Sequence, residues 1–110
     1  EEAVARYLAC RGWHILARNW HSPRGELDIV AMDRTGAIVA VEVKTRGRDR
    51  ISRTQAAATV SQWKAVKLVR CLHDFLACHP ALRYYRARID VMCVTPSGMH
   101  YFQGITDEWN

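Results

Sequence analysis

The sequence has no apolar run approaching the roughly 20 residues that a helix needs to cross a bilayer. It opens on Glu1 and Glu2, where a secretory signal would carry basic and then apolar residues. We therefore expect a cytoplasmic protein with no membrane partner. An initiator Met is also missing, so the sequence is compatible with native residues before Glu1.

Glycine and proline are scarce. With six Gly, three Pro, 49% apolar and 25% charged residues, the composition is unlike that of a disordered chain and typical of a globular protein. A length of 110 residues predicts a single domain spanning residues 1–110. Four cysteines without a CxxC spacing do not resemble a disulfide scaffold, so we expect reduced and mostly buried thiols.

Negative charge is in the minority. Sixteen Lys and Arg against eleven Asp and Glu give a formal net charge of +5 and a pI near 9.3. Such a balance attracts polyanions where the positive charge is clustered. Nucleic acid is therefore a candidate partner, although composition alone does not specify it.

Apolar periodicity and turn-forming residues predict elements in the order αβββαββ. The predicted helices span residues 1–11 and 61–78, and the predicted strands span residues 13–20, 26–33, 37–44, 84–94 and 99–103. Gly12 and Pro80 follow the two helix ends, where caps and breakers are common. Helices covering both faces of a mixed sheet would give a three-layer α/β domain.

The second predicted helix is amphipathic. Its apolar arc contains Val66, Leu68, Val69, Leu72, Phe75 and Leu76. Its polar arc contains Lys64, Lys67, Arg70 and Asp74. We expect the first arc to face the core and the second to be solvated.

The strands at residues 26–33 and 37–44 form a predicted hairpin whose register depends on its loop. A three-residue loop, 34–36, places Asp28 directly opposite Glu42 on one face of the sheet. A two-residue loop, 35–36, would turn Glu42 to the other face. The longer loop ends on a Gly, which suits a left-handed last position, and it keeps the apolar faces together. We predict the three-residue loop.

In this register the carboxylates of Asp28 and Glu42 lie within about 5 Å of each other, which is destabilising unless a proton or cation compensates. Clustered oxygen ligands suit a hard cation such as Mg²⁺. Lys44 shares a strand face with Glu42 and can supply part of the positive charge. In the alternative reading, both acids are exposed strand residues paired with Lys44 or Arg24.

Positive charge follows the second of these strands directly. Four arginines occupy the polar loop after it: Arg46, Arg48, Arg50 and Arg53. They are candidate phosphate contacts, or they belong to a solvated loop. Lys64 is a further candidate phosphate contact, although a solvated helix face is the simpler interpretation of it. Trp20 and Trp63 could stack on unpaired bases, but core positions are the commoner outcome for tryptophan.

Two blocks, GELD at residues 25–28 and VEVKTR at residues 41–46, resemble the PD-(D/E)XK nuclease signature. More closely, the chain is similar to the YraN-like family of uncharacterised bacterial proteins, related to archaeal Holliday junction resolvases. The similarity covers nearly the whole chain. Its other segments are residues 5–8, residues 15–19, Lys64 and residues 88–91.

The resemblance implies a restriction-endonuclease-like core with an Mg²⁺ or Mn²⁺ site. It implies that Asp28 and Glu42 bind the metal and that the backbone carbonyl of Val43 is a third ligand. It also implies that Lys44 positions or activates the attacking water. Ala65 stands where many members carry Gln, which argues against an active-site role for the second helix.

Further acidic residues receive roles from the resemblance. Glu1 matches the first-helix acid that completes such sites in resolvases, with Glu2 as its competitor. Glu26 lies on the same strand face as Asp28. It would either contact the metal ligands without binding the metal itself or pair with Arg24. Asp90 lies on a later strand and is interpreted as structural.

The function implied is an Mg²⁺-dependent endonuclease that hydrolyses phosphodiester bonds of DNA, with structure-selective or nonspecific recognition. The alternative is a nucleic-acid-binding module that retains the metal site with little or no cleavage. The resolvase analogy also implies a homodimer.

Overall fold

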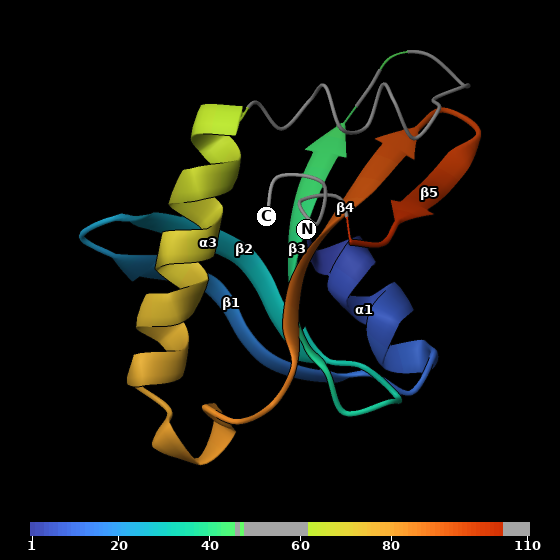
Figure 1. The fold of residues 1–110 in the computed structure, drawn as a ribbon. Coiled ribbons are helices and arrows are strands. Elements are labelled where there is room, and N and C mark those ends of the chain that lie inside the picture. Colours follow the sequence, from blue (N-terminus) through green and yellow to red (C-terminus); the bar gives the residue numbers. More distant parts are fainter. Residues whose placement is uncertain (46, 48–61, 105–110) are drawn as a thin grey trace.

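The computed structural model describes residues 1–45, Gly47 and residues 62–104. The described elements are α1 (Glu2–Cys10), β1 (His14–Ser22), β2 (Gly25–Met32), β3 (Ile38–Thr45), α3 (Gln62–Ala77), the short 3₁₀ helix η1 (Pro80–Leu82), β4 (Ala87–Thr95) and β5 (Gly98–Phe102). The sheet lies between α1 and α3 (Figure 1). The mixed α/β class is therefore confirmed.

The five described strands form one sheet in the order β1-β2-β3-β4-β5. Strands β3 and β4 run parallel, and the other three neighbouring pairs are antiparallel. A parallel pair needs a long crossover, and α3 lies in the connection between β3 and β4. The sheet is therefore mixed, as predicted, and mostly antiparallel.

Each helix covers one face of the sheet with its apolar side. On one face, Leu68, Leu72 and Phe75 of α3 join a buried cluster with residues of β2, β3 and β4. On the other face, Val4 and Leu8 of α1 join a second cluster. Burial of such side chains contributes about 1.5 to 3 kcal/mol each, so both helices are held chiefly by the sheet.

The buried arc of α3 differs in detail from the predicted arc. Val66 is 38% exposed, whereas Ala65 and Cys71 are buried against the sheet. Adjacent residues on a helix are about 100° apart, so burying Ala65 turns Val66 away from the core. The prediction for Val66 is wrong because it weighted large apolar residues above small ones.

The fourth strand begins later than predicted. It starts at Ala87 rather than Tyr84, because the chain first forms η1 and a turn. The Tyr85 N–H donates to the Leu82 carbonyl at 3.0 Å, which keeps this segment out of the sheet.

The three-residue hairpin loop is confirmed. Asp33 N–H donates to the Ala37 carbonyl at 2.9 Å, and Gly36 has a φ of +90°. The Asp33 carboxylate accepts hydrogen bonds from the N–H groups of Thr35 and Ala37, at 2.9 and 3.0 Å. These bonds fix the turn, and the paired residues run from Met32 with Ile38 to Ile29 with Val41.

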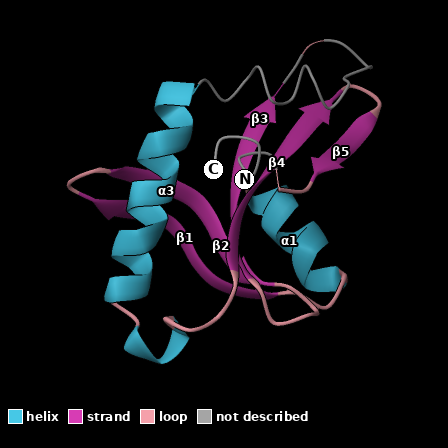
Figure 2. Cartoon of the chain, in the orientation of Figure 1, coloured by secondary structure: helices cyan, strands magenta, loops and turns pink. Residues whose placement is uncertain are grey.

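The alternation of side chains between the two faces of the sheet breaks at one residue of β2. Leu27 belongs to the α3 side of the sheet, although Ile29 and Ala31 belong to the α1 side. Pairing of β2 with β3 stops at Ile29, whereas pairing with β1 continues to Gly25. The end of the β1–β2 hairpin, paired on one side only, lies beside α3 (Figure 2).

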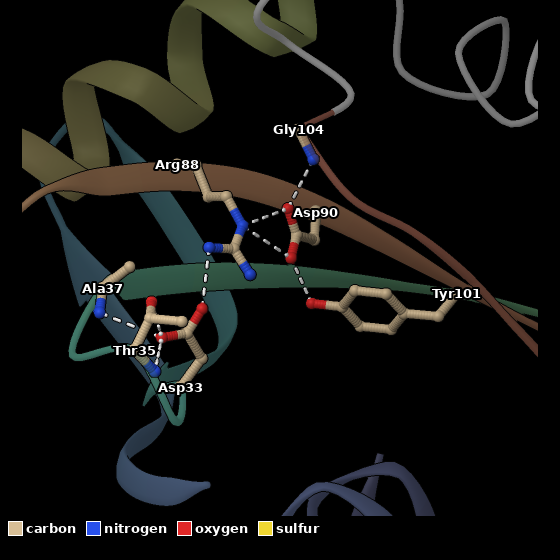
Figure 3. Close-up of polar contacts among 7 residues, drawn as sticks. All are labelled: Asp33, Thr35, Ala37, Arg88, Asp90, Tyr101 and Gly104. Atoms are coloured by element: carbon tan, nitrogen blue, oxygen red, sulfur yellow. Dashed lines mark hydrogen bonds and ion pairs between the residues drawn. The ribbon is translucent and has the colours of Figure 1, made fainter.

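A buried ionic network joins the hairpin loop to the later strands (Figure 3). Arg88 donates to Asp33 at 2.8 Å and to both oxygens of Asp90 at 3.1 Å. Asp90 is fully buried and also accepts bonds from the Tyr101 hydroxyl and the Gly104 N–H. These contacts support the structural interpretation of Asp90.

Cys71 and Cys93 are buried free thiols, but Cys10 and Cys78 are exposed, so the prediction of mostly buried thiols holds for half of them. In the described part of the chain, neither helix has the length and apolar character of a membrane span.

Candidate functional site

Asp28 and Glu42 face each other where β2 and β3 separate. The paired register ends at Ile29 and Val41, and the carboxyl groups of the next residues, Asp28 and Glu42, share a hydrogen bond. The Val43 N–H donates to Asp28 Oδ2 at 2.9 Å, so the main chain of β3 holds this carboxyl. The predicted juxtaposition of the two acids is therefore confirmed.

Two lysines contact Glu42 from different elements. Lys44 Nζ, on the same strand, lies 3.2 Å from Glu42 Oε2, and Lys64 Nζ, on α3, contacts the same oxygen. Glu42 is only 5% exposed, so these ammonium groups compensate a charge that water hardly reaches. The predicted Lys44 contact is confirmed, whereas Arg24 pairs with Asp74 instead.

These side chains line an open hollow with a volume of about 350 Å³. We call it the acid–lysine hollow. Its charged lining residues are Glu1, Glu26, Asp28, Glu42, Lys44, Lys64 and Lys67. One accessible hollow is therefore lined by acidic and lysine side chains of β2, β3, α3 and the first residue of the chain.

The two central acids have opposite pKa shifts. Burial raises the pKa of Asp28 to about 7, and the neighbouring charge of Glu42 adds to the rise. Burial would also raise the pKa of Glu42, but hydrogen bonds from Lys64 and Asp28 and the charge of Lys44 hold it below its ordinary value. Below neutral pH the pair therefore holds one proton, chiefly on Asp28, and it loses this proton as the pH rises through about 7.

The oxygens of this site fit a divalent cation if the main chain takes part. No three His, Cys, Asp or Glu side chains converge as metal ligands within residues 1–45, 47 and 62–104. Two carboxylates are present, and the Val43 N–H points to Asp28. The N–H and carbonyl of one strand residue point to the same side, so the Val43 carbonyl also faces this side. Lysines already contact Glu42, so a cation would compete with Lys64.

Glu1, Glu2 and Glu26, the other acidic residues considered for the site, lie in different surroundings. Glu1 lines the acid–lysine hollow, whereas Glu2 forms an exposed pair with Arg6 at 3.7 Å. Glu1 precedes α1 as its N-cap, so it does not sit on the helix as the resemblance implied. Glu26 also lines the hollow, and its Oε1 lies 3.5 Å from His21 Nε2. The predicted pairing of Glu26 with Arg24 is wrong, because Arg24 pairs with Asp74.

The nucleic-acid contacts predicted on the loop after β3 lie outside the described residues. These are Arg46, Arg48, Arg50 and Arg53. The side chain of Trp63 is likewise not described, while Trp20 packs edge-to-face on Phe75 with ring centroids 5.4 Å apart. Trp20 is therefore half-buried and packs against the core on the α3 side of the sheet.

Lys64 has a role that the sequence interpretation missed. It was expected on a solvated helix face or at a phosphate, yet it contacts buried Glu42. A signal was available: Glu42 shares its strand face with Ile38 and Ala40, both of which pack under α3. A lysine in the first turns of that helix is therefore positioned to reach Glu42.

The five-stranded mixed sheet, one helix on each face, and the acid–lysine hollow define a small α/β protein with a buried carboxylate–lysine site. The chain belongs to the Uncharacterised protein family UPF0102, whose family model matches residues 1–94.

Curated relatives support this assignment. The UPF0102 protein of Thermosynechococcus vestitus is 40% identical over 94 residues, covering 86% of this chain and 75% of the relative. That of Roseiflexus castenholzii is 41% identical over 96 residues, covering 86% and 74%. That of Kineococcus radiotolerans is 34% identical over 111 residues, covering 96% and 88%. Most of each relative is therefore represented in this chain.

Proposed function

We propose that this protein is an Mg²⁺- or Mn²⁺-dependent endonuclease that hydrolyses phosphodiester bonds of DNA. We further propose that its core is of the restriction-endonuclease-like, PD-(D/E)XK type related to archaeal resolvases, and that it recognises DNA by structure or without specificity. A cytoplasmic location and a homodimer belong to the same proposal. The dimer rests on analogy with resolvases alone.

One observation carries this proposal. Asp28 and Glu42 face each other across two strands, with Lys44 and Lys64 on the same carboxylate and an accessible hollow beside them. A purely structural ion pair has no need of two opposed acids, one of which has its pKa raised to about 7. An acid pair with adjacent cations suits a reaction in which negative charge develops on a phosphate.

The residues of the hollow would divide the work. Asp28, Glu42 and the Val43 carbonyl would hold the divalent ion, which supplies Lewis-acid polarisation of a phosphoryl oxygen and a lowered pKa of water. Lys44, held at 3.2 Å from Glu42, would orient the attacking water and place positive charge beside the phosphate. Lys64 would add a second positive charge from α3.

The alternative is a nucleic-acid-binding module that keeps the site but cleaves little. The contact of Lys64 with Glu42 favours this reading, because it occupies an oxygen that a cation would need. The net charge of +5 favours binding of nucleic acid under either proposal.

Cleavage assays distinguish the endonuclease from the binding module. Labelled linear, flapped and four-way DNA would be incubated with Mg²⁺, Mn²⁺ or EDTA. We expect metal-dependent cutting by the wild type and a loss of at least roughly a hundredfold in Glu42→Gln, because transition-state electrostatics of this kind are worth about 3 to 4 kcal/mol. Binding without cutting on every substrate would favour the module.

A matched control uses an acid outside the hollow. Asp74→Asn makes the same type of change on α3, in a surface pair with Arg24. It should cleave like the wild type. Metal-dependent cutting that survives Glu42→Gln as well would refute the assignment of the site.

A further inference from the structure

A second hollow lies at the end of α3 away from Glu42. Its volume is about 370 Å³. Its lining combines apolar side chains with a histidine and an arginine: His73, Leu76, Ala77, Pro80 and Arg83. At a rise of about 1.5 Å per residue, Lys64 and Leu76 lie roughly 18 Å apart along the helix. We call this the far-end hollow, and it shares no lining residue with the acid–lysine hollow.

The adjoining segment, residues 83–86, exposes two aromatic rings between two arginines. Tyr84 is 86% exposed and Tyr85 is 45% exposed. The Arg83 guanidinium lies over the Tyr84 ring, 4.8 Å from its centroid. We call residues 83–86 the Arg–Tyr loop. A ring this exposed is accessible to a binding partner.

The backbone of the Arg–Tyr loop is held at both ends. The N–H groups of Arg83 and Tyr85 donate to the carbonyls of Pro80 and Leu82, at 3.3 and 3.0 Å. The Arg86 carbonyl accepts from the Ile38 N–H at 2.7 Å. A fixed backbone presents the rings without a large ordering cost on binding.

The local charge favours an anionic partner. The sequence from Phe75 to Ile89 contains no Asp or Glu, and it includes Arg83 and Arg86 on the exposed loop. Asp74, next to this stretch, pairs with Arg24 at 2.6 Å. Cations near an exposed aromatic face match a strand of unpaired nucleotides, in which phosphates alternate with flat bases.

We propose that the Arg–Tyr loop and the far-end hollow form a binding site for single-stranded nucleic acid. A base stacks on the Tyr84 ring, Arg83 and Arg86 contact phosphates, and a neighbouring nucleotide enters the far-end hollow. Paired bases hide their faces from such a platform, and an acidic peptide would use the cations but not the ring. The site is separate from the acid–lysine hollow and does not require cleavage.

Fluorescence anisotropy in EDTA tests the platform, because metal-dependent cleavage is then absent. The probe is fluorescein-labelled oligothymidylate, with duplex DNA of the same length as a comparison. Tyr84→Ala should weaken binding of the single strand by about 5- to 150-fold, from a stacking contribution of about 1 to 3 kcal/mol. Tyr84→Phe should retain binding, and duplex binding should change far less.

The chain offers a matched control on α1. Tyr7 is 38% exposed, and the Arg11 guanidinium lies 5.6 Å from its ring centroid, so Tyr7→Ala removes a similar pair elsewhere. It should bind the single strand like the wild type. Equal losses in Tyr7→Ala and Tyr84→Ala would overturn the proposal, and so would equal losses on duplex and single strand.

Photocrosslinking locates the contact directly. An oligonucleotide carrying 5-bromodeoxyuridine should crosslink within residues 79–86, as found by peptide mapping. Crosslinks confined to other segments would overturn the site. Two results together would indicate an acidic protein partner instead: polyglutamate of equal charge displaces the oligonucleotide from this segment, and Tyr84→Ala does not weaken binding.

Discussion

Asp28 and Glu42 are neighbouring carboxyls with different proton affinities. The difference comes from their surroundings: burial and the negative charge of Glu42 raise the pKa of Asp28, while Lys64 and Lys44 hold the pKa of Glu42 down. Because the two lysines contact Glu42, the proton resides chiefly on Asp28. A site arranged in this way can release a proton when a cation arrives.

Replacing Asp28 by Asn should stabilise the metal-free protein by about 1 to 2 kcal/mol near pH 8 and hardly at all near pH 4. A carboxyl whose folded pKa is about 7 costs stability as the pH rises from its unfolded pKa toward that value. Asn carries no such charge, and its oxygen can still accept from the Val43 N–H. Urea unfolding in EDTA across this pH range measures the difference, and a gain independent of pH would contradict it.

Lys64 should contribute to stability through Glu42. We expect Lys64→Ala to cost about 1 to 2 kcal/mol, because it leaves a nearly buried carboxylate with one ammonium contact fewer, and the partial exposure of Lys64 limits the loss. The cost should largely disappear in a Glu42→Gln background, which a double-mutant cycle by urea unfolding measures. Arg70→Ala, an exposed cation on the same helix, should change stability by less than about 0.5 kcal/mol.

At the scale of elements, the hairpin was predictable because its local rules agree. A Gly at the last loop position, a carboxylate that caps the turn and two apolar strand faces all indicate the same register. The contact between Asp28 and the Val43 main chain follows from that register. The local sequence therefore contains enough information to bring the two acids together.

Gly36→Ala tests how strongly the loop holds that register. We expect a cost of about 1 kcal/mol, because an L side chain is strained at its φ of +90°. A Cβ at Gly36 would meet no atom within 4 Å, so backbone strain alone is measured. Gly47→Ala also has open space and no positive φ, and thermal unfolding should show no comparable loss. Equal effects at the two positions would argue against a strained loop.

Contacts between distant elements were not predictable in the same way. Leu27 departs from alternation because β3 ends its pairing with β2 at Ile29, a property of the assembled sheet. Lys64 reaches Glu42 because of where α3 crosses the sheet. The helical periodicity of the sequence does not determine that position. The apolar arc of α3 identifies a buried side, but the exact rotation that exposes Val66 depends on the sheet beneath it.

For the whole molecule, α3 connects two proposed functions. Its first turns supply Lys64 and Lys67 to the acid–lysine hollow, and its last turns supply His73 and Leu76 to the far-end hollow. A nucleic acid that binds both would lie along the helix. On these proposals, a substrate with a single-stranded arm suits the molecule better than a plain duplex.

Metal binding should register in the stability of the whole domain, because a ligand that binds only the folded state raises the unfolding temperature. We expect Mn²⁺ to raise that temperature in the wild type and not in Glu42→Gln. Lys64→Ala should bind Mn²⁺ roughly tenfold more tightly, because no Lys64 ammonium group competes for Glu42 Oε2. The same variant should cleave DNA more slowly, because it lacks a positive charge at the phosphate. Thermal unfolding over a Mn²⁺ titration gives the affinity. Weaker metal binding in Lys64→Ala would show that Lys64 supports the ion rather than competes with it.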